Sequence, residues 1–199
     1  MLKHDPPDFP SDVFLLLETV EVTVIIAEST TKTQAVSAAE FLKTDMKRKI
    51  VLKIRLPPME VNRDILRTYK IMPRAQNAHA YVNAGFLFKF NESQTRLLSI
   101  RICYGGINPQ FVHATATEKR LPGVDLFEGN VIQSAFQSLD QDIQPDSSLD
   151  EPTPQHRKIL ALGIFYKAVL KTRVIWNSAI IFDFRKLSPR ATSAEGYSS

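Results

Sequence analysis

Residues 69–90, YKIMPRAQNAHAYVNAGFLFKF, hold the pattern that decides the fold. From His79 onward the apolar side chains recur at every second position, and this period of two predicts a half-buried strand. The residues expected on the buried face are Ala80, Val82, Ala84, Phe86, Phe88 and Phe90. Those expected on the open face are Tyr81, Asn83, Gly85, Leu87 and Lys89. An alternating segment that ends at Ile71 predicts a second strand, and the polar turn 73–78 joins the two.

Further elements are expected on both sides of this stretch. Ser11 or Asp12 can cap a helix over 13–19, because either side-chain oxygen accepts free N–H groups of the first turn. Alternation predicts further strands over 20–26, 32–37, 52–56 and 98–104. Apolar spacing predicts helices over 114–121, 130–139 and 154–171, after a helical turn over 38–43. The order, strands first and helices later, indicates an α+β fold with helices on one face of an antiparallel sheet.

The last part of the chain gives the least regular pattern. Thr153 and Pro154 are suited to the N-cap and first position of the helix over 154–171. Its buried residues are expected to be Ile159, Leu162, Tyr166 and Val169. Residues 174–184 favour a strand, and the polar tail that follows predicts disorder.

Composition sets the outer limits. The 199 residues carry a net charge of +4, which permits an anionic ligand without requiring nucleic acid. The single cysteine, Cys103, excludes an internal disulfide and fits a reducing compartment. The first ten residues lack the apolar core of a signal peptide, so we expect a cytoplasmic protein.

The spacing of charged and polar residues points to few candidate binding sites. Lys70 at a strand end, with Arg74 in the adjoining turn, could hold an anionic group. The four histidines lack the spacing of a metal site, and Cys103 fits a packed thiol better than a nucleophile. A basic run could contact phosphates, although a solvated strand edge is the commoner role of such a run. Its members are Lys43, Lys47, Arg48, Lys49, Lys53 and Arg55.

Three segments carry a family resemblance. FLKTDMKRKIVLKIRLPP (41–58), TYKIMPRAQNAHAYVNAGFLFKF (68–90) and ICYGGINP (102–109) resemble the flavin half of the aldehyde oxidase and xanthine dehydrogenase family, and more closely the aldehyde oxidases. DFPSDVFLLLET (8–19) and TPQHRKILALGIFYKAVLK (153–171) extend the resemblance over roughly residues 1–172. It implies the end of a PCMH-type FAD-binding domain over 1–58. A CO dehydrogenase flavoprotein C-terminal-like domain over 62–172 and a divergent tail over 173–199 then follow.

The resemblance also implies a cofactor and its contacts. Matched position by position, Asp12, Val51 and Lys70 stand where the family contacts FAD, and no catalytic or metal-binding residue is implied. A cation at Lys70 would stabilise negative charge on the reduced ring. In this family, electrons reach FAD from a molybdopterin through two 2Fe-2S clusters. Those groups belong to domains outside this sequence, in a homodimeric enzyme.

The sequence departs from the family pattern in two places. The family's glycine-rich pyrophosphate loop would precede residue 1, which implies a truncated flavin domain. The turn at Gln76, Asn77 and Ala78 is neutral where dehydrogenases carry acidic residues, which favours O2 over NAD as the electron acceptor. The alternative is a non-catalytic remnant or interaction module that no longer binds FAD. Nucleic-acid binding through the basic run ranks last.

Overall fold

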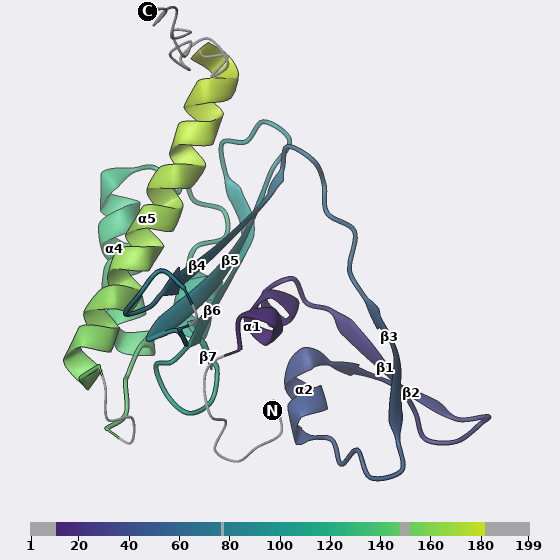
Figure 1. Ribbon diagram of the computed structural model, residues 1–199. Helices are drawn as coiled ribbons and strands as arrows, with labels where there is room; N and C mark the ends of the chain where they lie inside the picture. Colours follow the sequence, from purple (N-terminus) through teal and green to yellow (C-terminus); the bar gives the residue numbers. More distant parts are fainter. Residues whose placement is uncertain (1–10, 77, 148–151, 182–199) are drawn as a thin grey trace, which may run out of the picture.

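The computed structural model describes residues 11–76, 78–147 and 152–181, which form two antiparallel sheets flanked by helices (Figure 1). The first sheet has the strand order β2-β1-β3 and the second the order β4-β5-β6-β7. The strands are β1 (Thr23–Ala27), β2 (Thr33–Ser37), β3 (Ile50–Arg55), β4 (Asp64–Ile71), β5 (Val82–Phe90), β6 (Leu97–Gly105) and β7 (Val112–His113). The helices are α1 (Asp12–Thr19), α2 (Ala38–Lys43), α3 (Thr115–Arg120), α4 (Gly129–Asp142) and α5 (Pro154–Ile181). This α+β arrangement confirms the predicted fold class.

Local capping explains where the first two helices begin. The Ser11 hydroxyl accepts a hydrogen bond from the Phe14 amide at 3.2 Å, which satisfies one free N–H group of α1. At α2, Ser37 and Glu40 form a reciprocal capping box, with each side chain accepting from the other residue's backbone N–H. Both helices pack with the first sheet around a small core that includes Phe14, Val24 and Ile26. The predicted helix start at Ser11 is confirmed.

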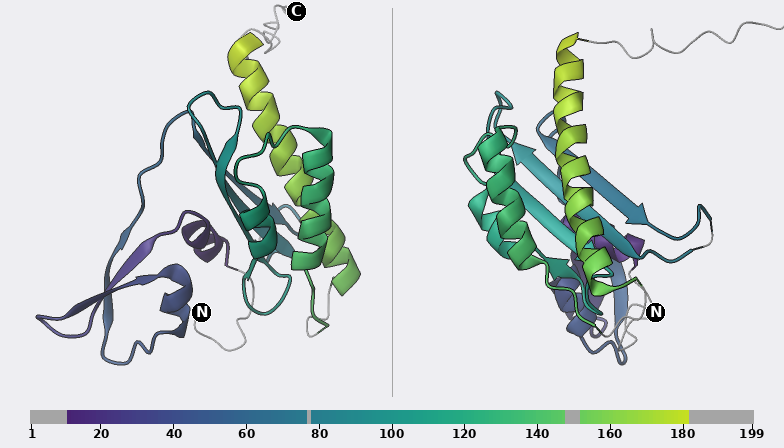
Figure 2. Two further views of the ribbon diagram at one scale, coloured as in Figure 1. Left: turned by 180° about the vertical axis from the view of Figure 1, so that it is seen from behind. Right: turned by 90° about the vertical axis from the view of Figure 1, so that its left-hand side faces the viewer.

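The second sheet carries the larger core. Helices α4 and α5 cover one of its faces, as Figures 1 and 2 show. The aromatic side chains Phe86, Phe88 and Phe90 of β5 point into this layer and are fully or almost fully buried. The Tyr104 hydroxyl of β6 donates to the Ala161 carbonyl of α5 at 3.1 Å, which ties the helix to the sheet. The apolar face predicted for residues 80–90 is therefore the core face.

The opposite face of β5 departs from the prediction. We expected a half-buried strand, but Asn83 and Leu87 on the supposed open face are 0% and 1% exposed. Helix α1 lies across this face and brings Thr19 directly above Gly85. A Cβ atom on Gly85 would lie 2.0 Å from the Thr19 hydroxyl oxygen, so only glycine allows this approach. Strand β5 is thus buried on both faces, and its half-buried assignment was wrong.

The start of α5 is held by a buried arginine. Arg157 has no exposed surface, and its guanidinium donates to the carbonyls of Pro152 at 2.9 Å and Asp146 at 2.6 Å. It also donates to the carbonyls of Gly106 and Ile107, in the turn after β6. The predicted start of this helix is confirmed, with Pro154 as its first residue. The Thr153 hydroxyl accepts from the His156 amide at 3.3 Å.

Two predictions about α5 need correction. The predicted burial of Val169 is confirmed, at 1% exposed, but Ile159 is 56% and Tyr166 47% exposed. The buried face otherwise contains Ala161, Phe165 and Ala168. The buried face of α5 is therefore rotated about the helix axis relative to the predicted face. The small side chains of Ala161 and Ala168 let the helix lie close to the sheet. The helix also continues to Ile181 where we expected a strand from residue 174; the tail predicted to be disordered lies outside the described residues. Within the described part of the chain, no helix has the length and apolar character needed to cross a bilayer.

Substitution of Gly85 tests the close approach of α1. We expect Gly85→Ala to lower the free energy of unfolding by about 1–3 kcal/mol, because the added methyl group displaces Thr19. Urea denaturation of the full chain measures the change. As a control, Gly163→Ala in α5 meets nothing within 4 Å and should raise stability by about 0.5–1 kcal/mol. Adding Thr19→Ala to Gly85→Ala should restore part of the loss; full stability of the single variant would contradict the packing.

Candidate flavin-contact site

Two of the three residues proposed from resemblance, Asp12 and Lys70, meet at the N-terminal end of α1. The Lys70 ammonium lies 2.8 Å from the Asp12 carboxylate oxygen Oδ2, joining the end of β4 to the first residue of the helix. The side chains of Lys70 and Asp12 are 33% and 48% exposed, so a ligand could reach the pair from solvent. The pair brings together two residues separated by 58 positions in the sequence.

A third residue fixes this pair from the sheet side. The Asn83 amide nitrogen donates to Asp12 Oδ1 at 2.7 Å, so the two carboxylate oxygens have different partners. Asn83 is fully buried on β5 and lies opposite Lys70 in the strand register. This role of Asn83 was not predicted, because the alternation of the sequence placed Asn83 on an open face. A polar amide near the start of a mostly apolar strand was the available signal.

The remaining predicted contact lies in the other sheet. Val51 is on β3, in register with Ile26 of β1, and is 39% exposed. The structure shows no contact between Val51 and the Asp12–Lys70 pair. The turn that we associated with the electron acceptor includes Asn77, which lies outside the described residues.

A second polar cluster holds the C-terminal end of α1. Glu18 is only 6% exposed, and its Oε1 atom lies 3.0 Å from an Arg101 guanidinium nitrogen and 2.9 Å from His113 Nε2. Arg101 also pairs with Glu21 at 3.2 Å, and His113 Nδ1 lies 3.5 Å from Glu118. These bonds connect α1 to β6, β7 and α3. The cluster was not predicted, because its members are scattered singly along the sequence.

The charges in this cluster reinforce one another. Hydrogen bonding to the Cys103 sulfur, and then to the carboxylates of Glu118 and Glu18, raises the pKa of His113 to about 11. Burial alone would raise the pKa of Glu18, but His113 and Arg101 lower it below 4.5. Burial raises the pKa of the Cys103 thiol, which has no exposed surface, so the predicted packed thiol is confirmed. The cluster therefore acts as a charged clamp on α1.

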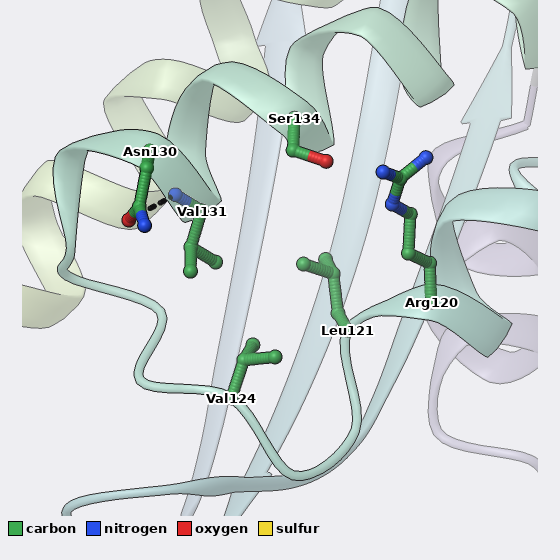
Figure 3. Close-up of a pocket in the computed structure, with 6 residues that line it drawn as sticks. All are labelled: Arg120, Leu121, Val124, Asn130, Val131 and Ser134. Carbon is green, nitrogen blue, oxygen red and sulfur yellow. Dashed lines mark hydrogen bonds between the residues drawn. The ribbon is translucent and has the colours of Figure 1, made fainter.

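Two surface cavities lie away from the Asp12–Lys70 pair. One of about 240 Å³ lies between α3 and α4, with Leu121, Val124 and Val131 among its lining residues (Figure 3). Arg120 and Ser134 stand at its polar side. The other, of about 340 Å³, adjoins β3 and the β1–β2 hairpin. Within the described residues, no group of three or more histidine, cysteine, aspartate or glutamate side chains could hold a metal ion.

The pH dependence of stability tests the clamp. A raised folded-state pKa means that protonated His113 stabilises the fold fully below pH 6.5 and loses this contribution as the pH rises towards 11. We expect His113→Gln to lower the free energy of unfolding by about 1–3 kcal/mol at pH 6. The difference from wild type should shrink between pH 6 and pH 10 in urea titrations. His156→Gln, at an exposed position of α5, is the matched control, and a pH-independent difference for His113→Gln would refute the clamp.

Comparisons with known proteins identify the family. The model of the CO dehydrogenase flavoprotein C-terminal domain matches residues 67–172, which is more than half of the chain. Xanthine dehydrogenase of Emericella nidulans is 28% identical over 118 residues, covering 59% of this chain and 9% of that protein. Aldehyde oxidase 4 of Mus musculus is 24% identical over 131 residues, covering 66% of this chain and 10% of that protein.

A solved structure supports the same fold. Quinoline 2-oxidoreductase from Pseudomonas putida 86 superposes with a TM-score of 0.67 at 20% identity, over 85% of this chain and 57% of that one. The chain thus spans about a tenth of the curated relatives that it matches and little more than half of this structural neighbour. The matched domain and these relatives agree with the resemblance first seen around residues 41–58, 68–90 and 102–109. The chain belongs to the CO dehydrogenase flavoprotein C-terminal domain family.

Proposed function

We propose that the chain is the flavin-domain portion of an aldehyde oxidase-like oxidoreductase, with FAD bound beside the Asp12–Lys70 pair. In this proposal residues 1–58 are the C-terminal part of a PCMH-type FAD-binding domain, and residues 62–172 are the domain that follows it. The observation that carries it is the 2.8 Å contact between Lys70 and Asp12. The family resemblance assigns flavin contacts to both residues independently of their proximity in the fold.

The chemistry of the pair fits the edge of a flavin ring. Bound FAD would supply the electron-transfer chemistry, and the Lys70 ammonium would stabilise negative charge that develops on the ring. Asp12 would orient Lys70 and offer a carboxylate acceptor, while Asn83 prevents Asp12 from turning away. Val51, on the partly exposed strand β3, would contribute backbone contacts. The Asp12–Lys70 pair would form one wall of the site.

The proposal extends to the electron path. Electrons would reach FAD from 2Fe-2S clusters and a molybdopterin in other domains of a homodimeric enzyme, and would leave to O2. The neutral residues Gln76, Asn77 and Ala78 support O2 rather than NAD as the acceptor, because they place no acidic charge in the turn after Lys70. The buried free thiol of Cys103 agrees with a cytoplasmic protein.

An interaction module that does not bind FAD is the second candidate. Asp12 and Lys70 already neutralise each other, so the fold does not need a ligand to compensate either charge. Strand β3 exposes apolar side chains along its whole length, which favours a contact with another polypeptide. This candidate and the flavin proposal differ in a single observable, the binding of FAD.

Cofactor binding by the full chain separates the two candidates. The flavin proposal predicts that the purified chain is yellow or takes up added FAD, with saturable quenching of flavin fluorescence. Equilibrium titration at increasing protein concentration measures the dissociation constant. Colourless protein that leaves flavin fluorescence unchanged would favour the interaction module.

Substitution of Lys70 tests the proposed contact itself. We expect Lys70→Met to raise the dissociation constant for FAD about tenfold, equivalent to about 1.4 kcal/mol, because the ring loses its neighbouring cation. Stability should change by no more than about 1 kcal/mol, since the ion pair is partly exposed. Lys89→Met on β5 is the matched control and should leave FAD binding unchanged. Equal affinities of wild type and Lys70→Met would remove Lys70 from the site.

A further inference from the structure

The cavity between α3 and α4 is built from residues that all lie inside the matched domain. Its lining runs from Arg120, the last residue of α3, to Ser134 in α4. The family match covers residues 67–172, so both helices and the loop between them fall within it. The walls of the cavity therefore include no residue from the part of the chain before residue 67.

Hydrogen bonds hold these walls in place. The Asp142 carboxylate near the end of α4 accepts from the Thr117 amide and hydroxyl of α3, each at 2.8 Å, which fixes one helix against the other. The loop between the helices is fastened to β6, because the Gly123 amide donates to the Leu97 carbonyl at 2.7 Å and the Leu97 amide donates to the Val124 carbonyl at 3.0 Å. A ligand would thus enter a largely preformed site.

One side of the cavity is apolar. Leu121, Val124 and Val131 form this apolar wall, and their side chains converge on the cavity in Figure 3. Leu121 is 2% exposed and belongs to the large core, and the two valines pack against that core. The volume of about 240 Å³ is below the ~300–1,000 Å³ that is typical of sites for drug-sized ligands. The apolar wall therefore suits a short aliphatic chain.

The other side of the cavity carries hydrogen-bond donors and no acid. Its polar residues are Arg120, Asn130 and Ser134, and no aspartate or glutamate lines the cavity. Within the part of the chain that the structure describes, the Arg120 guanidinium forms no ion pair and the Ser134 hydroxyl no hydrogen bond. The side-chain oxygen of Asn130 accepts from the Val131 amide at 2.7 Å, so Asn130 presents its NH2 donor to a ligand. This polar side selects an anion.

The two sides together define the chemistry of the ligand. A guanidinium can donate two parallel hydrogen bonds to one carboxylate, which matches both its geometry and its single charge. An inorganic anion would satisfy Arg120 but would leave the apolar wall uncovered. A hydrocarbon would cover the apolar wall but would leave the donors of Arg120 and Ser134 without an acceptor.

We propose that the cavity between α3 and α4 binds a small carboxylate with a short aliphatic chain. The carboxylate accepts hydrogen bonds from Arg120 and Ser134, which face each other across the cavity in Figure 3, and the chain lies against the apolar wall. The cavity is separate from the Asp12–Lys70 pair, so the inference is independent of FAD binding.

Titration of the isotope-labelled full chain with 3-methylbutanoate, followed by amide chemical shifts, tests the proposal. We expect saturable shifts confined to α3, the following loop and the first half of α4, with a dissociation constant on the order of 1 mM. Arg120→Gln should raise this constant about tenfold. Lys119→Gln is the matched control, because Lys119 is the adjacent exposed cation of α3 but does not line the cavity.

A second variant and two further ligands separate the two halves of the site. Ser134→Leu fills the cavity from α4 and should abolish the shifts while the urea unfolding midpoint stays close to that of the wild type. Acetate, which lacks the chain, and 3-methylbutanamide, which lacks the charge, should each bind about tenfold more weakly than 3-methylbutanoate.

Three results would overturn the proposal. The first is acetate binding as tightly as 3-methylbutanoate, which would leave an adventitious ion only. The second is unchanged affinity of Arg120→Gln or of folded Ser134→Leu. The third is the absence of saturable shifts at the cavity, or their appearance elsewhere in the chain.

Discussion

The contact of α1 with the outer face of β5 is the constraint on which the rest of the structure depends. Thr19 lies so close to Gly85 that no side chain fits at position 85, so the Thr19 side chain packs directly against the backbone of β5. Polar contacts fasten both ends of the helix. Asp12 binds Lys70 and Asn83 at its start, and Glu18 binds Arg101 and His113 near its end. An eight-residue helix is too short to be stable alone, so these contacts determine its position.

This arrangement couples the two sheets and the candidate site. Because α1 also contributes Phe14 to the core of the first sheet, it belongs to both layers. Any displacement of α1 from β5 would separate Asp12 from Lys70, since these residues lie on different elements. The buried clamp at Glu18 and the exposed pair at Asp12 thus have different roles. The clamp fixes the helix, and the pair presents a carboxylate and an ammonium group to solvent.

Much of the fold could be predicted from local patterns, and the failures have physical causes. The helix caps at Ser11 and Thr153 bond amides only three residues away, and the strand pattern of β5 repeats every second residue. Such short-range features can be recognised in the sequence itself. Asn83 and Gly85 are covered by α1, which lies some seventy residues earlier in the sequence. Because Asn83 is polar and Gly85 has no side chain, the sequence pattern placed both on a solvent-exposed face. Resemblance selected Asp12 and Lys70, and the structure places them in contact, whereas Val51 lies apart and its assignment stays a prediction. The Glu18 clamp joins four elements and has no local signature.

Hydrogen–deuterium exchange of the full chain, with and without saturating FAD, tests most directly whether the α1–β5 junction forms a flavin site. We predict that FAD slows amide exchange in α1, around Lys70 and around Asn83, because the ligand would stabilise the contacts among these three segments. Exchange in α4 and around the cavity at Arg120 should not change. Protection confined to that cavity, or no protection in the presence of excess FAD, would contradict the assignment of the flavin to this junction.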